Sequence, residues 1–236
     1  HFPFNSVVEE KNGKSIIFIH TTTDIYNLKD IVEKKLEDED RFNEKEYMKT
    51  IENIKCIKNM YEPESELDIE RYLFDLYERQ NGEIIEKLNE EHDFYIIVGH
   101  EPIVGSKLKK RKNNLMDISL LEVFDNPNFK DKKIIYLCAD IHLYQSGTIT
   151  LLNSDVIIHQ EIVGTGGAKL DICSSPEPKL FNKYQYEANI YNKDKKYKYE
   201  IKSCEPSHGF AILNINNEDI FSEFIQAEDI PLDNNL

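Results

Sequence analysis

The chain has 236 residues, of which 40% are hydrophobic and 31% are charged, and its formal net charge is −15 at pH 7. This composition is typical of a soluble globular protein and excludes a chain that is disordered throughout. The acidic charge argues against nucleic acid and against an anionic membrane as partners, because both require clustered cations. Two basic runs, at residues 107–112 and 193–198, are interpreted as solvated loops.

The sequence contains no apolar run close to the roughly 18 residues that span a bilayer. Its first residues, HFPFNSVV, lack the pattern of a signal peptide and contain no Met, so we expect a processed, trimmed or partial chain. The four cysteines lack the close spacing of a zinc ribbon or a redox pair, which favours a reducing compartment. The sequence does not identify the compartment.

The first predicted elements are a strand and a long helical region. Residues 15–24, SIIFIHTTTD, combine β-branched and aromatic residues with polar turn formers, which predicts a strand followed by a loop. From about residue 28 to residue 88, apolar residues recur at spacings of three and four, which predicts surface-lying helices. Within this region, residues 36–72 are predicted to form an acidic helical insertion.

Three short apolar runs follow, and polar or glycine-rich residues end each of them. They are DFYIIVGHEPIVG at residues 93–105, KKIIYLCADIH at residues 132–142 and DVIIHQEIVGTGGAKLDI at residues 155–172. Continuous apolar runs suit strands that are buried on both faces, as in sheets covered by helices. Towards the end of the chain, KYQYEANIYN and KYKYEIK predict two antiparallel strands, and HGFAILNINNEDIFSEFIQ predicts a closing hairpin.

The ends of the three apolar runs carry the candidate functional residues. Gly99 and His100 follow the first run, Asp140 and His142 follow the second, and residues 164–167 follow the third. Loops at the carboxyl ends of strands converge in layered α/β sheets, so we expect these residues to lie together. Imidazole suits zinc or iron and carboxylate suits magnesium or manganese, so the mixture predicts a divalent ion of intermediate hardness.

The order and spacing of these segments resemble the calcineurin-like metallophosphoesterases, and among them the purple-acid-phosphatase-like branch. VGHEP resembles the Gly-His-x-Pro turn of that family. LCADIHLYQ resembles its Gly-His-x-His motif, with Ala139 in place of the glycine and Asp140 in place of the first histidine. VGTGGAKLD is similar to its Gly-x-Gly-Gly turn and HGFAILNINNEDI to its closing hairpin. The resemblance covers most of the chain outside residues 36–72.

The resemblance implies an α/β fold, a metallophosphoesterase-type sandwich of two mixed β-sheets flanked by helices. Residues 1–236 would form one domain, the C-terminal portion of that fold and incomplete at its N-terminal side. The family's opening motifs, Asp-x-His, Gly-Asp and Gly-Asn-His, are not found upstream of Val98. We therefore expect the N-terminal half of the same domain as a partner, supplied as a separate chain or as a segment before His1.

The same resemblance implies a dinuclear site that holds two divalent or trivalent ions, from among Mn, Fe, Zn and Mg. His100 and Asp140 would bind the second ion and His142 the first, and no catalytic residue is assigned in this chain. Asp140 either binds as a harder ligand than imidazole or marks a weakened second site. Glycines would shape the substrate pocket, namely Gly99, Gly164, Gly166 and Gly167.

Two functions are compatible with this pattern. The first is a metal-dependent phosphoesterase, in which a metal-activated hydroxide hydrolyses a phosphorylated substrate. The alternative is a catalytically degenerate relative that serves as a structural or interaction component. Asp140 in place of an imidazole and the missing opening motifs favour the alternative, and the insertion at residues 36–72 would then be a partner-binding surface.

Overall fold

The fold was analysed in a computed structural model of the chain. The structure describes residues 5–23, 26, 66–109, 112–166, 169–172, 184–190, 195–216 and 220–227. The predicted insertion at residues 36–72 therefore lies outside the described residues, apart from its last residues, which begin a helix. Gly167 also lies outside them.

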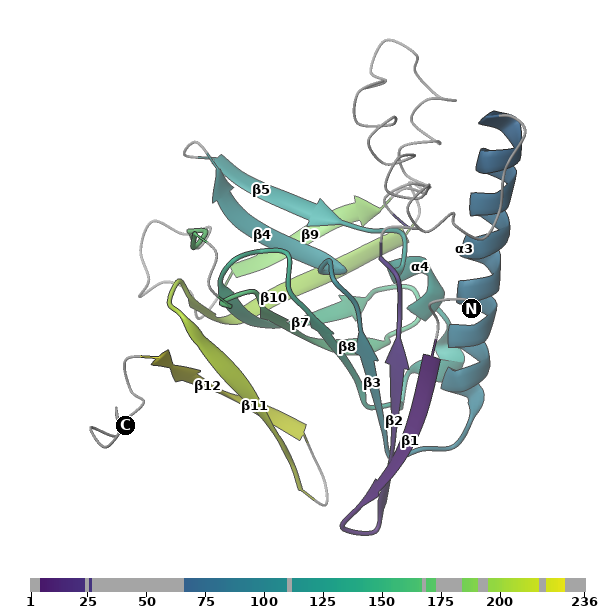
Figure 1. The fold of residues 1–236 in the computed structure, drawn as a ribbon, viewed down its shortest axis with the longest axis horizontal. Helices are drawn as coiled ribbons and strands as arrows, with labels where there is room; N and C mark the ends of the chain where they lie inside the picture. The colour runs from purple at the N-terminus through teal and green to yellow at the C-terminus, as the bar shows by residue number, and fades with distance from the viewer. Residues whose placement is uncertain are drawn as a thin grey trace, which may run out of the picture.

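An eight-stranded mixed sheet forms the centre of the molecule (Figure 1). Its strand order is β1-β2-β3-β6-β8-β7-β10-β9. Strands β2, β3, β6 and β8 run parallel to one another, and the strands on either side of them pair antiparallel. The strands are β1 (Asn5–Lys11), β2 (Lys14–His20), β3 (Phe94–Val98), β6 (Ile134–Cys138), β7 (Tyr144–Leu151), β8 (Ile157–Val163), β9 (Tyr184–Ile190) and β10 (Lys195–Glu205).

Two small antiparallel sheets and the helices complete the described fold. One small sheet pairs β4 (Val104–Lys109) with β5 (Lys112–Asp117), and the other pairs β11 (Gly209–Ile215) with β12 (Ile220–Gln226). The prediction of solvated loops at residues 107–112 and 193–198 is wrong for the described parts of both runs, which belong to strands β4 and β5 and to strand β10. The helices are α3 (Glu66–Asn89), α4 (Leu121–Phe124) and a 3-10 turn at Pro127–Phe129.

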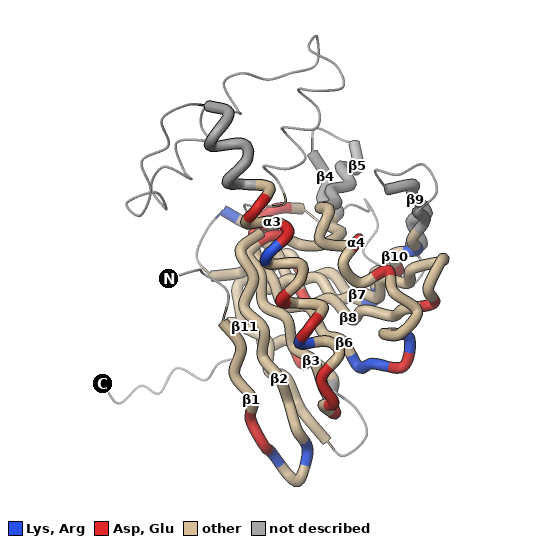
Figure 2. The backbone as a smooth tube through the Cα atoms, turned by 90° about the vertical axis from the view of Figure 1, so that its right-hand side faces the viewer, with Lys and Arg blue, Asp and Glu red and all other residues tan. Residues whose placement is uncertain are grey.

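Helix α3 covers one face of the sheet because its apolar residues repeat at helical spacing. Leu76, Tyr77, Ile84 and Leu88 are buried in one cluster with residues of β2 and β3, including Ile97. Charged residues lie along α3 and near the turn between β1 and β2 (Figure 2). The helix is therefore held to the sheet by an apolar stripe, together with the buried Gln80, whereas Glu78, Arg79 and Glu86 are exposed to solvent.

The opposite face of the sheet carries a second, smaller apolar cluster. Ile16, Phe94, Ile96 and Ile135 are buried there, and Ile215 of β11 packs against them. Side chains alternate between the two faces of a strand, so this face is the one opposite α3. The β11–β12 hairpin thus forms a third layer, on the other side of the sheet from the helix.

The α/β class and the mixed sheet are confirmed. The sheet that packs on the opposite face from α3 differs from the expected second mixed sheet: within the described ranges it is the antiparallel β11–β12 hairpin. The predicted closing hairpin and the predicted pairing of β9 with β10 are both found. In the part of the chain that the structure describes, no helix has the length and apolar character needed to cross a bilayer.

The two described cysteines differ in state. Cys138 is buried in β6 with a free thiol, whereas Cys204 in β10 is disulfide-bonded. Disulfides are uncommon in reducing compartments. The disulfide at Cys204 therefore does not support the expected reducing compartment, which stays a prediction.

Candidate functional site

The loops that follow β3 and β6 meet at the carboxyl edge of the parallel strands. The backbone N–H of Gly99 donates to the carbonyl of Leu137 at 3.0 Å, and that of Ala139 donates to the carbonyl of His100 at 2.9 Å. These bonds bring His100 Nε2 to 4.0 Å from Asp140 Oδ1, with the two side chains 68% and 39% exposed. Two of the predicted site residues therefore lie side by side, in solvent.

The two candidate ligands that follow β6, Asp140 and His142, are separated by a tight turn. Asp140 has a positive φ of 47°, and the N–H groups of Ile141 and Leu143 donate to the carbonyls two residues earlier. Aspartate tolerates this backbone region better than most residues. Ile141 and Leu143 are fully buried, so Asp140 and His142, which alternate with them, face outwards.

His142 is held by the segment at residues 169–171. Its backbone N–H donates to Asp171 Oδ2 at 3.1 Å, and its carbonyl accepts from the Asp171 N–H at 2.8 Å. His142 Nδ1 lies 3.2 Å from the carbonyl oxygen of Lys169. A carbonyl oxygen only accepts, so Nδ1 donates this hydrogen bond, which places the lone pair of a neutral ring on Nε2.

The described residues do not bring the three predicted metal ligands together into one group. His100 and Asp140 form a pair, and His142 contacts the backbone of Lys169. Among the residues that the structure describes, no group of three or more His, Cys, Asp or Glu side chains is placed to hold a metal ion. Tight binding needs three or four protein ligands in fixed positions. The assignment of His100, Asp140 and His142 as metal ligands stays a prediction.

Gly99 has a packing role that accounts for its place in the sequence. A Cβ atom there would overlap the hydroxyl of Tyr136 and lie 2.8 Å from Thr23 Cγ2. Tyr136 is fully buried, and its hydroxyl donates to the carbonyl of Glu101 at 2.7 Å. The glycine therefore lets this tyrosine fix the loop that carries His100.

Gly164 and Gly166 differ in the space that is available for a side chain. A Cβ atom at Gly164 would overlap the carbonyl oxygen of Ile141, whereas one at Gly166 would meet nothing within 4 Å. Gly164 is thus required for close approach of the turn after β6. The prediction that Gly99, Gly164, Gly166 and Gly167 shape a substrate pocket stays untested, and the first two already have a structural reason.

A buried glutamine ties the sheet to the loop after β3. Gln160 Oε1 accepts from the N–H of Ile103 at 2.8 Å and of Val104 at 3.3 Å, and Gln160 Nε2 donates to the Val104 carbonyl at 2.6 Å. Gln160 Nε2 also lies 3.3 Å from the Tyr199 hydroxyl, which donates to Gln145 Oε1 at 2.8 Å. These hydrogen bonds fix the loop after β3 to the large sheet.

Glu161 is a buried carboxylate that our sequence reasoning missed. It is 7% exposed, its Oε1 accepts from Ser146 Oγ at 2.8 Å, and its Oε2 has no partner among the described residues. Burial raises the pKa of its carboxyl. Hydroxyls of Ser222, Ser146 and Tyr144 offset part of that rise. The sequence signal was the three consecutive polar residues, His159, Gln160 and Glu161, inside the apolar run VIIHQEIV.

Replacing Glu161 with glutamine should stabilise the fold at high pH. A raised pKa means that ionisation opposes folding, so this penalty appears as pH rises above the unfolded pKa of about 4.3 and is complete above the folded pKa. We expect Glu161→Gln to raise the free energy of unfolding by about 1 kcal/mol near pH 8, and by about zero near pH 3. Urea denaturation at both pH values measures this. A variant less stable than the wild type near pH 8 would refute it.

Comparisons with known proteins assign no family. No family model matches the chain, and no curated protein matches it. A solved structure titled "GAP50 the anchor in the inner membrane complex of Plasmodium" is similar, at 14% sequence identity and a TM-score of 0.45. The similarity covers 94% of this chain and 49% of that one, so this chain spans about half the length of that structure. A similarity at this level assigns neither family nor function, and the metallophosphoesterase relationship stays a prediction.

Proposed function

We propose that this chain is a structural or interaction component that binds a partner polypeptide through the outer face of the β11–β12 hairpin. The observation that carries this proposal is the exposure of Phe210, Ile212 and Phe221, which are 45%, 41% and 52% exposed. Clustered exposed apolar side chains on a folded protein mark interaction sites. We call this surface, made by Phe210, Ile212 and Phe221 with Ile225, the outer hairpin face.

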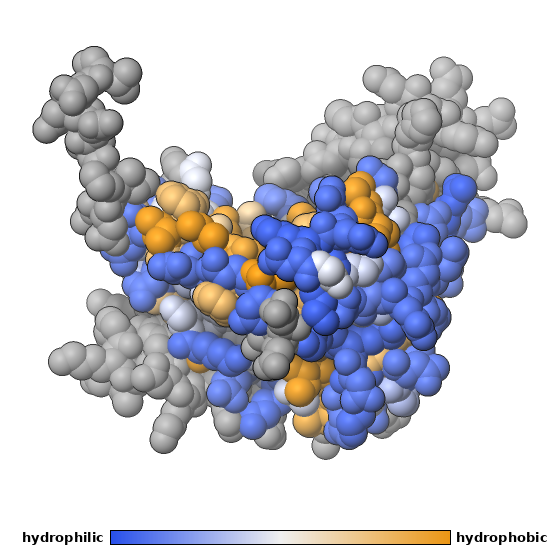
Figure 3. Space-filling model, turned by 90° about the horizontal axis from the view of Figure 1, so that it is seen from below, coloured by the Kyte–Doolittle hydropathy of each residue, from blue (hydrophilic) through white to orange (hydrophobic). Residues whose placement is uncertain are grey.

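The strand register supports a single outer face. Phe210 pairs with Ile225 and Asn214 pairs with Phe221, and residues directly opposite in an antiparallel pair share a face. The inner face, by contrast, packs on the large sheet, where the ring of Phe224 stacks on the ring of Tyr144 in β7. In the view from below, apolar atoms gather on the side where the hairpin lies in Figure 1 (Figure 3).

The hairpin also offers unpaired strand edges. Among the described residues, β11 and β12 pair only with each other, so each strand has one edge without a strand neighbour. Such edges accept an added strand through main-chain hydrogen bonds. We propose as occupant the N-terminal half of the same fold, as a separate chain or as a segment before His1. A strand-bearing polypeptide of this kind would extend the hairpin and cover its apolar face.

Removal of the outer aromatic rings tests this proposal. We expect the double variant Phe210→Ser with Phe221→Ser to bind the proposed N-terminal half of the fold at least about tenfold more weakly, because buried aromatic anchors dominate interface energies. Isothermal titration calorimetry with purified components gives the affinity. The matched control is Leu152→Ser with Ile157→Ser, two other exposed apolar residues, 44% exposed each, and it should bind normally.

Two outcomes would count against this proposal. Equal weakening by the control variant would mean that general loss of apolar surface, and not the outer hairpin face, determines binding. A concentration-dependent dimer of the chain alone that disappears in the Phe210 and Phe221 variant would assign the face to a second copy. Sedimentation equilibrium separates these cases.

Phosphoester hydrolysis is a second candidate, favoured by two observations. His100 and Asp140 lie 4.0 Å apart at the edge of the sheet, and the tautomer of His142 leaves Nε2 able to bind a ligand. Elemental analysis and p-nitrophenyl phosphate hydrolysis with added Mn²⁺ test it. About two bound ions per chain, with hydrolysis abolished by His142→Ala, would replace the interaction proposal with an enzymatic one.

A further inference from the structure

A chain of hydrogen bonds at the amino edge of the parallel strands joins a serine, a histidine and a glutamate. Ser15 Oγ lies 2.8 Å from His92 Nδ1, and His92 Nε2 lies 3.3 Å from Glu90 Oε2. Ser15 lies near the start of β2, and the other two residues belong to the connection between α3 and β3. The cluster is therefore at the opposite edge of the sheet from His100 and Asp140.

The charge of Glu90 determines where the protons of the imidazole lie. A hydrogen bond from Lys87 at 2.6 Å, and a second one from His92, hold the pKa of the Glu90 carboxyl below its usual range. Glu90 is therefore ionised at neutral pH and only accepts hydrogen bonds. Nε2 of a neutral His92 ring must then carry the proton, so the lone pair of Nδ1 accepts from the Ser15 hydroxyl. In this arrangement an imidazole serves as the general base of a nucleophile.

Other hydrogen bonds hold both ends of this chain in place. The backbone N–H of Ser15 donates to Asp93 Oδ2 at 2.9 Å, and the Asp93 N–H donates to the Ser15 carbonyl at 2.9 Å. At the other end, the hydroxyl of the buried Tyr95 accepts from the His92 N–H at 3.1 Å and donates to the Glu90 carbonyl at 2.7 Å. A reactive geometry that is fixed in this way needs little reorganisation when a substrate arrives.

The serine is open to solvent, whereas the base is largely shielded from it. Ser15 is half-buried, and the His92 side chain is 10% exposed. The ammonium group of Lys14 lies 2.9 Å from Asp93 Oδ1. Lys14 therefore offsets a carboxylate that would otherwise oppose negative charge developing beside Ser15.

We propose that Ser15 is a nucleophile that accepts the acyl group of an uncharged carboxylic ester, with His92 as general base and Glu90 as the residue that positions the ring. Ser15 Oγ bonds to the carbonyl carbon and its proton passes to His92 Nδ1. The ester C–O bond breaks as His92 returns the proton to the departing alcohol. Water then hydrolyses the acyl-serine to a carboxylic acid and restores the hydroxyl. This proposal does not rest on the function proposed for the outer hairpin face.

Labelling with a fluorophosphonate tests the proposal, because this probe reacts with activated serines. Ser15 Oγ displaces fluoride from phosphorus, and mass spectrometry of tryptic peptides locates the adduct. We expect Ser15→Ala to abolish labelling at this position and His92→Gln to slow it at least about a hundredfold. Imidazole added to a folded His92→Ala protein should restore part of the rate, which a purely structural role of His92 does not predict.

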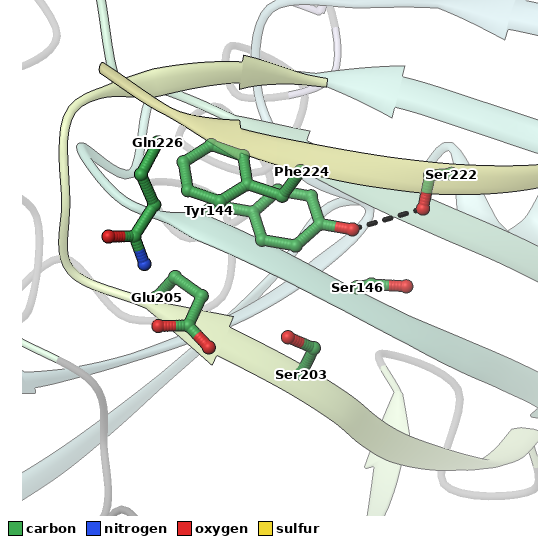
Figure 4. A pocket seen from close by; sticks show the side chains of 7 residues that line it. All are labelled: Tyr144, Ser146, Ser203, Glu205, Ser222, Phe224 and Gln226. Carbon is green, nitrogen blue, oxygen red and sulfur yellow. Dashed lines mark hydrogen bonds between the residues drawn. The ribbon is translucent and has the colours of Figure 1, made fainter. Parts of the chain in front are cut away.

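Three other half-buried serines are internal controls for this experiment. Ser6 lies in the neighbouring strand β1. Ser203 and Ser222 line a groove between the large sheet and the hairpin, and the residues that line this groove include no histidine (Figure 4). Ser15 is the one described serine whose hydroxyl bonds to a histidine ring. The three control serines should therefore stay unlabelled while Ser15 reacts.

Glu90→Gln tests the positioning role, and Glu91→Gln makes the same charge change at an exposed neighbour. Glu90 contacts the base and not the ester, so Glu90→Gln should lower the maximal rate of p-nitrophenyl acetate hydrolysis at least about tenfold and leave KM within about twofold. Glu91→Gln should change neither quantity by more than about twofold. An unlabelled Ser15 in the folded wild-type protein, or equal labelling in wild type and His92→Gln, would overturn the proposal.

Discussion

Replacing Gly164 with alanine should lower the free energy of unfolding by about 3 kcal/mol. The new Cβ would overlap the carbonyl oxygen of Ile141 and lie 2.7 Å from its carbonyl carbon and 3.2 Å from the Cα of His142. These are backbone atoms, and the Gly164 N–H donates to the Leu143 carbonyl of the same turn at 3.1 Å. The turn therefore has little room to move aside without losing that hydrogen bond. Urea denaturation gives the difference.

Gly166→Ala is the matched control for this experiment. Its Cβ would meet nothing within 4 Å, so the free energy of unfolding should change by less than about 0.5 kcal/mol. Similar losses in the two variants would show that flexibility of the glycine-rich segment, and not contact with the turn after β6, makes Gly164 necessary.

Replacing Gln160 with leucine should cost about 3 kcal/mol of stability. The substitution leaves the N–H of Ile103 and both backbone groups of Val104 without their partner, in a buried place. Each buried polar group that loses its partner costs about 1–3 kcal/mol, and leucine recovers part of this through apolar burial. Denaturation in urea measures the loss, and amide exchange at Ile103 shows whether the loop has loosened.

Thr148→Val provides the comparison for Gln160→Leu. Thr148 Oγ1 is buried and has no hydrogen-bond partner among the described residues. Removing an unpaired hydroxyl should leave stability unchanged or raise it slightly. A Gln160→Leu protein as stable as the Thr148→Val protein would mean that the hydrogen bonds of Gln160 contribute little to the fold.

The buried parallel strands were predictable because each has a strong apolar signal of its own. The runs at β3, β6 and β8 predicted three strands, and the structure makes them neighbours. Strand β7 was not predicted, since its sequence YQSGTITL contains serine, threonine and glycine. Its strand form depends on pairing with β8 and β10: a Cβ at Gly147 would lie 2.7 Å from Tyr199 Cε2. Such strands are determined by neighbours more than by composition.

The sequence predicted only part of the candidate site, because the rest of its geometry depends on contacts between distant segments. The proximity of His100 to Asp140 follows from parallel strands ending at one edge, and the structure shows it. The direction of His142 depends on the positive φ at Asp140 and on contacts with residues 169–171. Those contacts join distant parts of the chain, and no local pattern encodes them.

Amide hydrogen exchange across residues 209–226 most directly tests whether the outer hairpin face is a docking surface. We expect β11 and β12 to exchange at least about tenfold more slowly when the purified chain is mixed with the proposed N-terminal half of the fold, because docking covers the face and pairs a strand edge. Unchanged exchange in both strands within a formed complex would place the contact elsewhere and contradict the proposed role of Phe210, Ile212 and Phe221.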